Sequence, residues 1–385
     1  MLRGLQGILP GFRLLVFISV VFLIACSSED TANDSDTGSD SAPDTEMSED
    51  AGDTGDASEP AFEMHMVDVG SGMSVVIAGP DFLIVVDGGS DDDTGSGDDN
   101  RLVAYLQAIR PDLTHIDHVI LTHPHNDHIS MLPDLFERYT VDEVWDSGTP
   151  SALCSYHGFL TAVEARDAAY HSPVADAGEH VISLVSPCDS DPDEVTLSHG
   201  DRITVGMSVA LGESAEMTFL FAAETPDETD PNLDSMVIRV DLGDRRILLM
   251  GDAQGGSSNV TADPPDSGSI EALLLESPEE IAADVLQVGY HGYSESSHAA
   301  FLEAVSPSFS LIASYPNFAP PTQSVLDALE EYGSIFRTDA DDDACRANSA
   351  KVGTDADDLP GGCDNIRVAF DTEGSITAEY FIPED

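Results

Sequence analysis

Three histidines and one aspartate within six residues constrain this chain more than any other feature. The segment His123-Pro-His125-Asn-Asp127-His128 follows residues 118–121, an apolar stretch with the character of a buried strand. His123 and His125 are two positions apart, so in an extended segment both imidazoles point to the same side, as two ligands of one metal ion must. Asp127 and His128 are adjacent and their side chains diverge. One short loop can therefore serve two metal ions.

The N-terminus predicts export and lipid attachment. Arg3 and Arg13 precede an apolar run at residues 14–24, and Ala25 and Cys26 follow, which is the layout of a secretory signal and too short to span a bilayer comfortably. The sequence Leu23-Ile-Ala-Cys26 resembles the lipobox of bacterial lipoproteins, and this resemblance implies cleavage before Cys26 with lipid added to that residue. Residues 1–26 are thus expected to be a lipoprotein signal, although an ordinary cleaved signal that happens to contain a cysteine is the alternative.

The chain is strongly acidic, with a formal net charge of −59. Residues 27–60 contain 12 of the 73 acidic residues, no Lys or Arg and almost nothing apolar, so we expect a disordered tether there. Most of the acidic charge belongs to residues 61–385, where adaptation of the surface to salt or solubility is the simplest cause. A field of this sign repels polyphosphates, so tight nucleic-acid binding is disfavoured.

Four cysteines remain once Cys26 is assigned to lipid, an even number that predicts up to two disulfides in an exported protein. None belongs to a CxxC pair, which argues against a zinc knuckle. Cys345 and Cys363 flank an acidic segment that their pairing would close. Cys154 and Cys188 then follow as partners by elimination.

Short β-like runs alternate with amphipathic segments from residue 62 onward. The expected strands are 62–69, 74–78, 82–86, 118–121, 141–145, 203–210, 217–222, 236–242, 247–250, 285–288, 309–312, 335–336, 366–370 and 376–381, and the expected helices are 101–110, 131–139, 297–305 and 323–332. Strands interleaved with helices in two similar halves predict two β-sheets packed face to face with helices outside.

The His cluster matches in full the HxHxDH motif of the metallo-β-lactamase superfamily, which the chain resembles. Four further segments resemble the variant found in the extracytoplasmic domain of the competence protein ComEC. They are Met66-Val-Asp68-Val-Gly70-Ser-Gly72 with Val86-Asp87-Gly88-Gly89, Asn232-Leu-Asp-Ser235-Met-Val, Leu249-Met-Gly251-Asp252-Ala253, and Ala283-Asp284-Val-Leu-Gln-Val-Gly289-Tyr290-His291-Gly292. The resemblance runs from about residue 62 to 381 and implies an αββα sandwich of two mixed sheets over residues 61–385.

The resemblance also assigns the metal ligands. It implies that His123 and His125 hold one ion, that Asp127 and His128 hold a second, and that Asp252 bridges the two. Asp87 resembles the aspartate that orients the metal loop without binding metal itself.

Two departures from the family pattern concern the remaining ligands. Relatives have two adjacent histidines where this chain has Tyr290-His291, so the second ion either lacks a ligand or takes it from His291 alone. The histidine that often completes the first site has no clear counterpart, the candidates being His157, His171, His180 and His199. Asn232 and Ser235 are expected to face the site as hydrogen-bond donors and, with Asp127, to take part in catalysis.

Ligands of His and Asp without thiolate suit Zn²⁺ first, with Mn²⁺ or Fe²⁺ as alternatives. We expect two ions with a hydroxide between them. The expected substrate is a small-molecule or oligomeric phosphodiester or related ester. The protein is expected to act as a monomer in the cell envelope. The alternatives are a β-lactam or lactone hydrolase, and a lipid-anchored binding protein that retains the fold without turnover. Tyr290 is the main support for the non-catalytic alternative.

Overall fold

The computed structural model describes residues 61–91, 95–185, 188, 192–227, 229–259, 264–314, 320–339, 365–381 and 383. They fall within one compact unit, Ala57–Asp385. The predicted signal with Cys26, the predicted tether 27–60, and the predicted pair Cys345 and Cys363 lie outside the described residues.

The first sheet has ten strands in the order β17-β16-β1-β2-β3-β4-β5-β6-β8-β7. Its strands are β1 Phe62–Met66, β2 Val75–Ala78, β3 Leu83–Val86, β4 His115–Leu121, β5 Thr140–Asp146, β6 Ala169–His171, β7 Gly178–Ser183, β8 Glu194–His199, β16 Ile366–Phe370 and β17 Ile376–Tyr380. Strands β1 to β3 form the predicted antiparallel meander. Strands β3 to β6 run parallel, as successive strands do when helices connect them.

The second sheet has seven strands in the order β15-β14-β13-β12-β11-β10-β9. Its strands are β9 Ser208–Ala210, β10 Ala215–Phe221, β11 Val237–Leu242, β12 Arg245–Leu249, β13 Val285–Gln287, β14 Phe309–Ile312 and β15 Ser334–Arg337. Strands β12 to β15 are parallel, whereas β9 to β12 pair antiparallel. Both sheets are therefore mixed.

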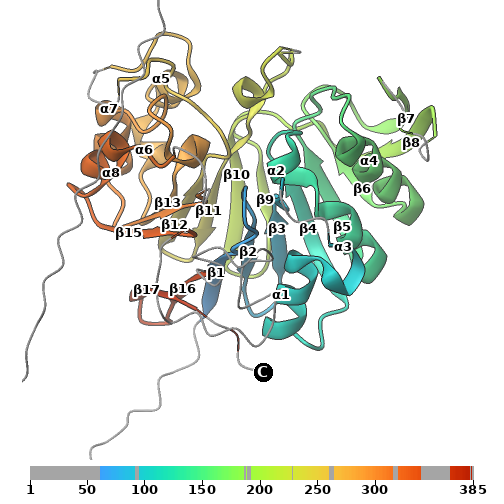
Figure 1. Cartoon of the computed structure of the whole chain (residues 1–385), viewed down its shortest axis with the longest axis horizontal. Coiled ribbons are helices and arrows are strands. Elements are labelled where there is room, and N and C mark those ends of the chain that lie inside the picture. Colours follow the sequence, from blue (N-terminus) through green and yellow to red (C-terminus); the bar gives the residue numbers. More distant parts are fainter. Residues whose placement is uncertain are drawn as a thin grey trace, which may run out of the picture. The chain divides into compact units, whose positions relative to one another are not determined.

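Helices cover the outer face of each sheet, giving four layers (Figure 1). The first group comprises α1 Arg101–Ile109, α2 Asn126–Ile129, α3 Leu132–Arg138 and α4 Cys154–Arg166, and the second comprises α5 Ile270–Leu274, α6 Pro278–Ile281, α7 Ala299–Val305 and α8 Gln323–Leu329. Three 3₁₀ turns are η1 Gly97–Asp99, η2 Pro231–Asp234 and η3 Gly289–Gly292.

Apolar side chains alternate between the layers, as the two-residue period of a strand requires. In β4, Ile120 packs between the two sheets with Phe219 of β10, whereas Val119 and Leu121 pack under α1, α3 and α4. A third cluster lies between the second sheet and α5 to α8. Truncating a fully buried aromatic such as Phe219 to alanine is expected to cost about 3–5 kcal/mol. The architecture is the predicted αββα sandwich.

One predicted element is wrong in its extent, and several elements were not predicted at all. The expected strand 203–210 exists only as Ser208–Ala210, because Met207 N–H donates to Thr204 O across a turn in which Gly206 has φ 83°. No element was predicted within 154–199, and this segment contains α4 and β6 to β8.

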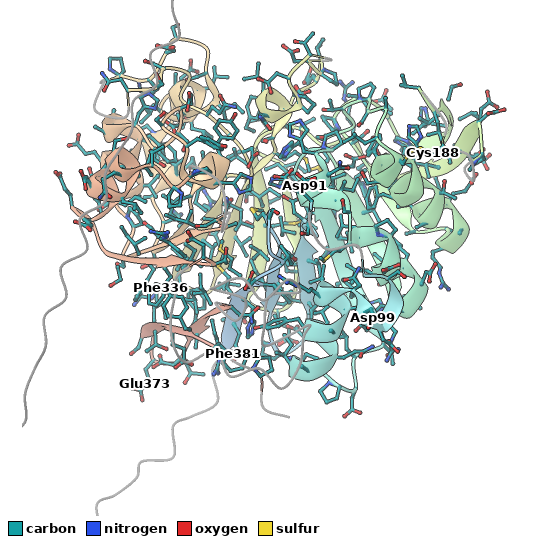
Figure 2. All side chains as sticks on the ribbon, in the orientation of Figure 1. Asp91, Asp99, Cys188, Phe336, Glu373 and Phe381 are labelled. Carbon is teal, nitrogen blue, oxygen red and sulfur yellow. A yellow bond between two sulfur atoms is a disulfide. The ribbon has the colours of Figure 1, made fainter. Side chains whose placement is uncertain are left out.

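The disulfide predicted between Cys154 and Cys188 is present, with the two Cα atoms 5.7 Å apart. It joins the start of α4 to the connection between β7 and β8, where Figure 2 labels Cys188. Among the helices of the described segments, none has the length and apolar character needed to cross a membrane.

Candidate metal centre

The predicted ligands meet where parallel strands of both sheets end. Loops after β3 and β4 in the first sheet, and after β12 and β13 in the second, approach one another there. The carboxyl ends of parallel strands are where open α/β sheets place their ligand sites. Met236 N–H, just before β11, donates to Thr122 O, just after β4, at 3.1 Å and ties the two sheets together beside the site.

His123, His125 and Asp252 form a first group of possible ligands. The Nε2 atom of His123 lies 3.0 Å from Nδ1 of His125 and 3.6 Å from Oδ2 of Asp252. His123 is fully buried, and its Nδ1 contacts the Thr122 hydroxyl at 3.2 Å, so Nε2 is the atom that faces the group.

Asp127, His128 and His291 form a second group. His128 Nε2 and His291 Nε2 are 3.2 Å apart, and Asp127 Oδ2 lies 3.3 Å from His291 Nε2. Asp127 and His128 are in the first turn of α2, whose N-cap residue is His125. This turn separates the side chains of the short loop into the two groups.

The carboxylate of Asp252 lies between the two groups. Its Oδ2 faces His123, whereas its Oδ1 lies 3.3 Å from the Nε2 atoms of both His128 and His291. Asp252 is 3% exposed, and no described residue donates a hydrogen bond to Oδ1. A carboxylate that offers one oxygen to each of two nitrogen-rich groups has the arrangement needed to bridge two metal ions. The donor set therefore fits a pair of divalent ions.

Outer contacts fix the histidines so that Nε2 faces the centre. Asp87 Oδ2 accepts from His128 Nδ1 at 2.6 Å and from the Thr122 hydroxyl at 2.7 Å, and Asp87 Oδ1 accepts from Thr122 N–H at 2.7 Å. His291 Nδ1 donates to Ala313 O at 2.8 Å. Such contacts set the tautomer and the ring orientation of a metal-binding histidine. Asp87 is completely buried beside His128 and Thr122.

The loop that carries His291 has an unusual backbone. Tyr290 and His291 both lie in the left-handed region, with φ of 51° each, which non-glycine residues rarely adopt. Strained conformations of this kind persist where the surroundings over-determine them, often at functional sites. The structure brings His291 and not the half-buried Tyr290 into the second group of ligands.

Glycine allows close contact with the aspartate loop. Gly72 has φ of 115°, and a Cβ atom there would lie 2.0 Å from Asp127 O. Its neighbour Met73 donates to the same carbonyl at 2.9 Å. The Gly70-Ser-Gly72 segment noted in the sequence thus supports the backbone of Asp127.

Gln287 is a supporting residue that the sequence analysis missed. Its Oε1 accepts from Met250 N–H at 2.6 Å and Gly251 N–H at 2.8 Å, and its Nε2 donates to Gly251 O at 3.2 Å. This amide holds the turn before Asp252. A buried glutamine in the otherwise apolar stretch 285–288 was the signal that could have found it.

The two residues predicted to donate hydrogen bonds in catalysis lie in different positions. Ser235 is fully buried, and its Oγ accepts from Asp252 N–H at 3.1 Å, so this contact positions the bridging carboxylate. Asn232 lies in η2, and its buried Oδ1 has no hydrogen-bond partner among the described residues. Their catalytic roles remain predictions.

None of the four histidines considered for the first ion belongs to a ligand group in the described part of the chain. His157 Nε2 contacts Ser151 O, and His171 contacts Asp201 O and Glu143. His180 and His199 lie against each other, with ring centroids 4.5 Å apart. The first group thus consists of His123, His125 and the shared Asp252.

Electrostatics in the centre favour a bound cation. Burial lowers the pKa of His123 well below its ordinary value. Burial would also lower the pKa of His291, but the carboxylates of Asp252 and Asp127 outweigh it and raise that pKa to about 10. Burial would raise the pKa of Asp252, but the imidazoles of His291, His128 and His123 hold it well below its ordinary value. Two buried carboxylates thus attract positive charge, which protons or metal ions can supply.

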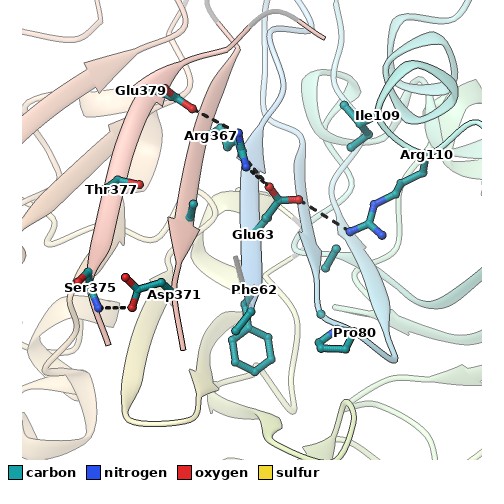
Figure 3. Close-up of a pocket in the computed structure, with 14 residues that line it drawn as sticks. Phe62, Glu63, Pro80, Ile109, Arg110, Arg367, Asp371, Ser375, Thr377 and Glu379 are labelled. Atoms are coloured by element: carbon teal, nitrogen blue, oxygen red, sulfur yellow. Dashed lines mark hydrogen bonds and ion pairs between the residues drawn. The ribbon is translucent and has the colours of Figure 1, made fainter. Parts of the chain in front are cut away.

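A large hollow of the described surface lies elsewhere. A cavity of about 930 Å³ is lined by β1, β16, β17 and the end of α1, and Figure 3 shows that its charges pair with one another. Glu63 Oε1 lies 2.6 Å from Arg367 Nη2, and Glu63 Oε2 lies 3.9 Å from Arg110 Nη2. Another group of possible ligands, His115, Asp117 and Asp142, is partly exposed on β4 and β5. Neither place contains a predicted site residue.

Two mixed sheets between helices, with paired His and Asp groups where the strands end, define an αββα fold with a candidate two-metal centre. Residues 67–206 match the model of the metallo-beta-lactamase superfamily. This match confirms the predicted resemblance to that superfamily over residues 67–206.

Curated relatives confirm the predicted resemblance to competence proteins. The chain is 30% identical to "Competence protein ComA" of Neisseria gonorrhoeae over 130 residues, which is 33% of this chain and 17% of the relative. It is 26% identical to "Recombination protein 2" of Haemophilus influenzae over 293 residues, which is 76% of this chain and 29% of the relative. The chain thus spans less than a third of the length of either relative. Among solved structures, the metallo-beta-lactamase fold protein YhfI from Bacillus subtilis matches with 13% identity and a TM-score of 0.40, over 71% of this chain and 95% of that chain.

Proposed function

We propose that this protein is a metal-dependent hydrolase of phosphodiester or related ester bonds that acts outside the cytoplasm. The observation that carries the proposal is the Asp252 carboxylate, which offers one oxygen to each of two His and Asp groups. Two bound divalent ions, with zinc preferred for this donor set, would lower the pKa of a water and stabilise the negative charge of the transition state. The match to a superfamily of metal-dependent hydrolases supports a hydrolytic reaction. The similarity to relatives named for competence and recombination supports a phosphodiester or related ester as the substrate.

The residues divide into ligands and supports. His123 and His125 would hold one ion and Asp127, His128 and His291 the other, with Asp252 shared between them. Asp87 keeps the proton of His128 on Nδ1, which leaves Nε2 free to bind metal. Asn232, whose Oδ1 has no hydrogen-bond partner among the described residues, is proposed to contact the substrate.

The test combines metal content with hydrolysis by the purified full chain. We expect close to two ions per chain and turnover of bis-p-nitrophenyl phosphate with Zn²⁺, Mn²⁺ or Fe²⁺. His123→Ala and Asp127→Ala should each abolish turnover, and His115→Ala, which changes a partly exposed histidine outside the centre, should leave it intact. Turnover that survives both changes, or two bound ions with no hydrolysis of any ester, would overturn the proposal. Turnover of a β-lactam or a lactone in preference to the phosphodiester would reassign the substrate.

We also propose that lipid on Cys26 tethers the domain to the cell envelope, in keeping with the signal-like N-terminus. Labelled palmitate should enter the wild-type chain and not Cys26→Ala, and the variant should no longer sediment with membranes. Palmitate incorporation into Cys26→Ala would contradict the anchor. The released domain is expected to elute as a monomer.

A further inference from the structure

A third group of possible metal ligands lies at the end of the first sheet that faces away from the candidate metal centre. His115 and Asp117 lie at the start of β4, and Asp142 lies on the neighbouring strand β5 (Figure 1). The centre follows the other end of β4, and the seven residues of this strand span roughly 20 Å. The side chains of His115, Asp117 and Asp142 are 40%, 31% and 66% exposed, so an ion from solvent can reach them directly.

The atoms of this group are spaced like the ligands of one zinc ion. His115 Nε2 lies 3.2 Å from Asp142 Oδ2 and 3.5 Å from Asp117 Oδ1. Nitrogen and oxygen ligands lie about 2.0–2.1 Å from zinc, and tetrahedral geometry then separates neighbouring ligand atoms by about 3.3–3.4 Å. All three ligand atoms lie within 4.8 Å of one another. One ion can therefore contact the imidazole and both carboxylates after only a small movement of side chains.

A chain of hydrogen bonds indicates which nitrogen of His115 carries the proton. The Thr140 hydroxyl donates to Thr114 O at 3.2 Å, so its oxygen acts as an acceptor for His115 Nδ1, which is 3.0 Å away. A neutral His115 therefore has its proton on Nδ1, and the lone pair of Nε2 faces two carboxylates. This contact is repulsive unless a cation lies between the three atoms. A metal-binding histidine has the same arrangement, with Nδ1 held by an outer oxygen and Nε2 on the ion.

The carboxylate of Asp117 is also held by a contact outside the group. Its Oδ2 accepts from Leu83 N–H of β3 at 2.7 Å, while its Oδ1 is the atom that lies toward His115. Contacts with β3 and β5 thus orient two of the three ligands before an ion arrives, so binding requires little further ordering of side chains. The formal net charge of −59 also attracts divalent cations to the surface of the chain.

We propose that His115, Asp117 and Asp142 bind one further divalent ion, with zinc preferred, which joins β4 to β5 independently of the candidate metal centre. An imidazole with two carboxylates favours zinc over Ca²⁺ and Mg²⁺, which take oxygen ligands. The ligands are more exposed than the buried histidines of the centre, so this site is the weaker one and fills at higher zinc concentrations. Its ion stabilises the folded domain and takes no part in hydrolysis.

The test measures zinc uptake by the full chain in a calorimetric titration, after loosely bound metal has been removed on a desalting column. We expect the wild type to take up one further zinc ion per chain and to bind Ca²⁺ much more weakly. Asp142→Asn, which keeps the size of an exposed side chain and removes its charge, should weaken this binding step by at least about tenfold. The thermal midpoint of the wild type should rise as this site fills, and that of Asp142→Asn should rise much less.

Asp244→Asn is the matched control, because it removes the same charge from an exposed turn between β11 and β12. This variant should bind the further ion as the wild type does, which distinguishes a defined site from general attraction to an acidic surface. No further ion at millimolar zinc, equal binding of Ca²⁺, or an equal loss in Asp142→Asn and Asp244→Asn would each overturn the proposal. Both variants should keep the hydrolytic activity of the wild type, since neither residue belongs to the centre, so failure of this site and failure of the proposed function are distinguishable.

Discussion

Replacing Asp87 with asparagine should weaken binding of the second metal ion while leaving the fold intact. Asp87 accepts three hydrogen bonds, one at Oδ1 from Thr122 N–H and two at Oδ2 from the Thr122 hydroxyl and His128 Nδ1. Asparagine has one acceptor oxygen. If that oxygen stays with Thr122 N–H, the new NH₂ group faces two former donors.

The consequence for His128 follows from its tautomer. An NH₂ group beside Nδ1 favours an imidazole whose proton lies on Nε2, the atom that faces Asp252 and His291. A protonated Nε2 cannot bind metal. Changes at such supporting residues typically cost about 10- to 100-fold in metal affinity, or about 1.4–2.7 kcal/mol, and we expect a loss in that range for the second ion.

The assay is a competition titration of Zn²⁺ against a chromophoric chelator, which resolves two binding steps. The first step should change by less than about threefold, because the hydrogen bonds of Asp87 in the described part of the chain go to Thr122 and His128 and not to His123, His125 or Asp252. Asp146→Asn is the matched control: Asp146 is equally buried but contacts tyrosine hydroxyls, and its replacement should leave both steps unchanged. Unchanged affinity for the second ion in Asp87→Asn, or an equal loss in Asp146→Asn, would refute the tautomer argument.

Three further predictions follow from the same geometry. Asp252→Asn removes the charge shared by both ligand groups and should reduce bound metal, measured by plasma mass spectrometry, from two ions to at most one; two retained ions would exclude a bridging role. Without metal, the pKa of His291 is raised to about 10, so protonation of this residue stabilises the folded state. This stabilisation is complete below pH 6.5 and is lost as the pH rises toward 10. The thermal midpoint in EDTA should therefore fall across that pH range more steeply in the wild type than in His291→Gln. Gly72→Ala should lower the free energy of unfolding in urea by more than about 2 kcal/mol, because the new Cβ atom would meet Asp127 O. Gly97→Ala is the control: Gly97 has φ of 59° and no atom within 4 Å of the new Cβ position, so the loss there should be only about 1 kcal/mol. Equal losses in the two variants would show that backbone strain alone is responsible.

The strands and the metal loop could be predicted from the sequence because each is encoded by a pattern of neighbouring residues. Strands such as β3 and β4 are short apolar runs, and the motif His123–His128 lies in one turn, so neighbouring residues contain most of the information. The pairing of Asp252 with both groups rested on a resemblance, because residues more than 120 positions apart meet only after the sheets pack.

What the sequence could not predict depends on tertiary contacts. The left-handed backbone at Tyr290 and His291, which brings His291 into the centre, has no glycine at either position to signal it. Helix α4 was missed because His157, Gly158 and Thr161 interrupt its apolar pattern, although Phe159 and Leu160 pack in the core. Strand β7 lies at the edge of its sheet and is largely exposed, so it lacks the apolar run of a buried strand.

The ligands come from both halves of the sandwich, since His123 and His128 follow β4 of the first sheet while Asp252 and His291 follow β12 and β13 of the second. Neither half alone contains a complete site, so metal should bind the packed domain far more tightly than the open chain. Bound ions would then hold the two sheets together, because the sheets could separate only after the metal is released. The rate at which the domain opens would therefore depend on the concentration of free metal.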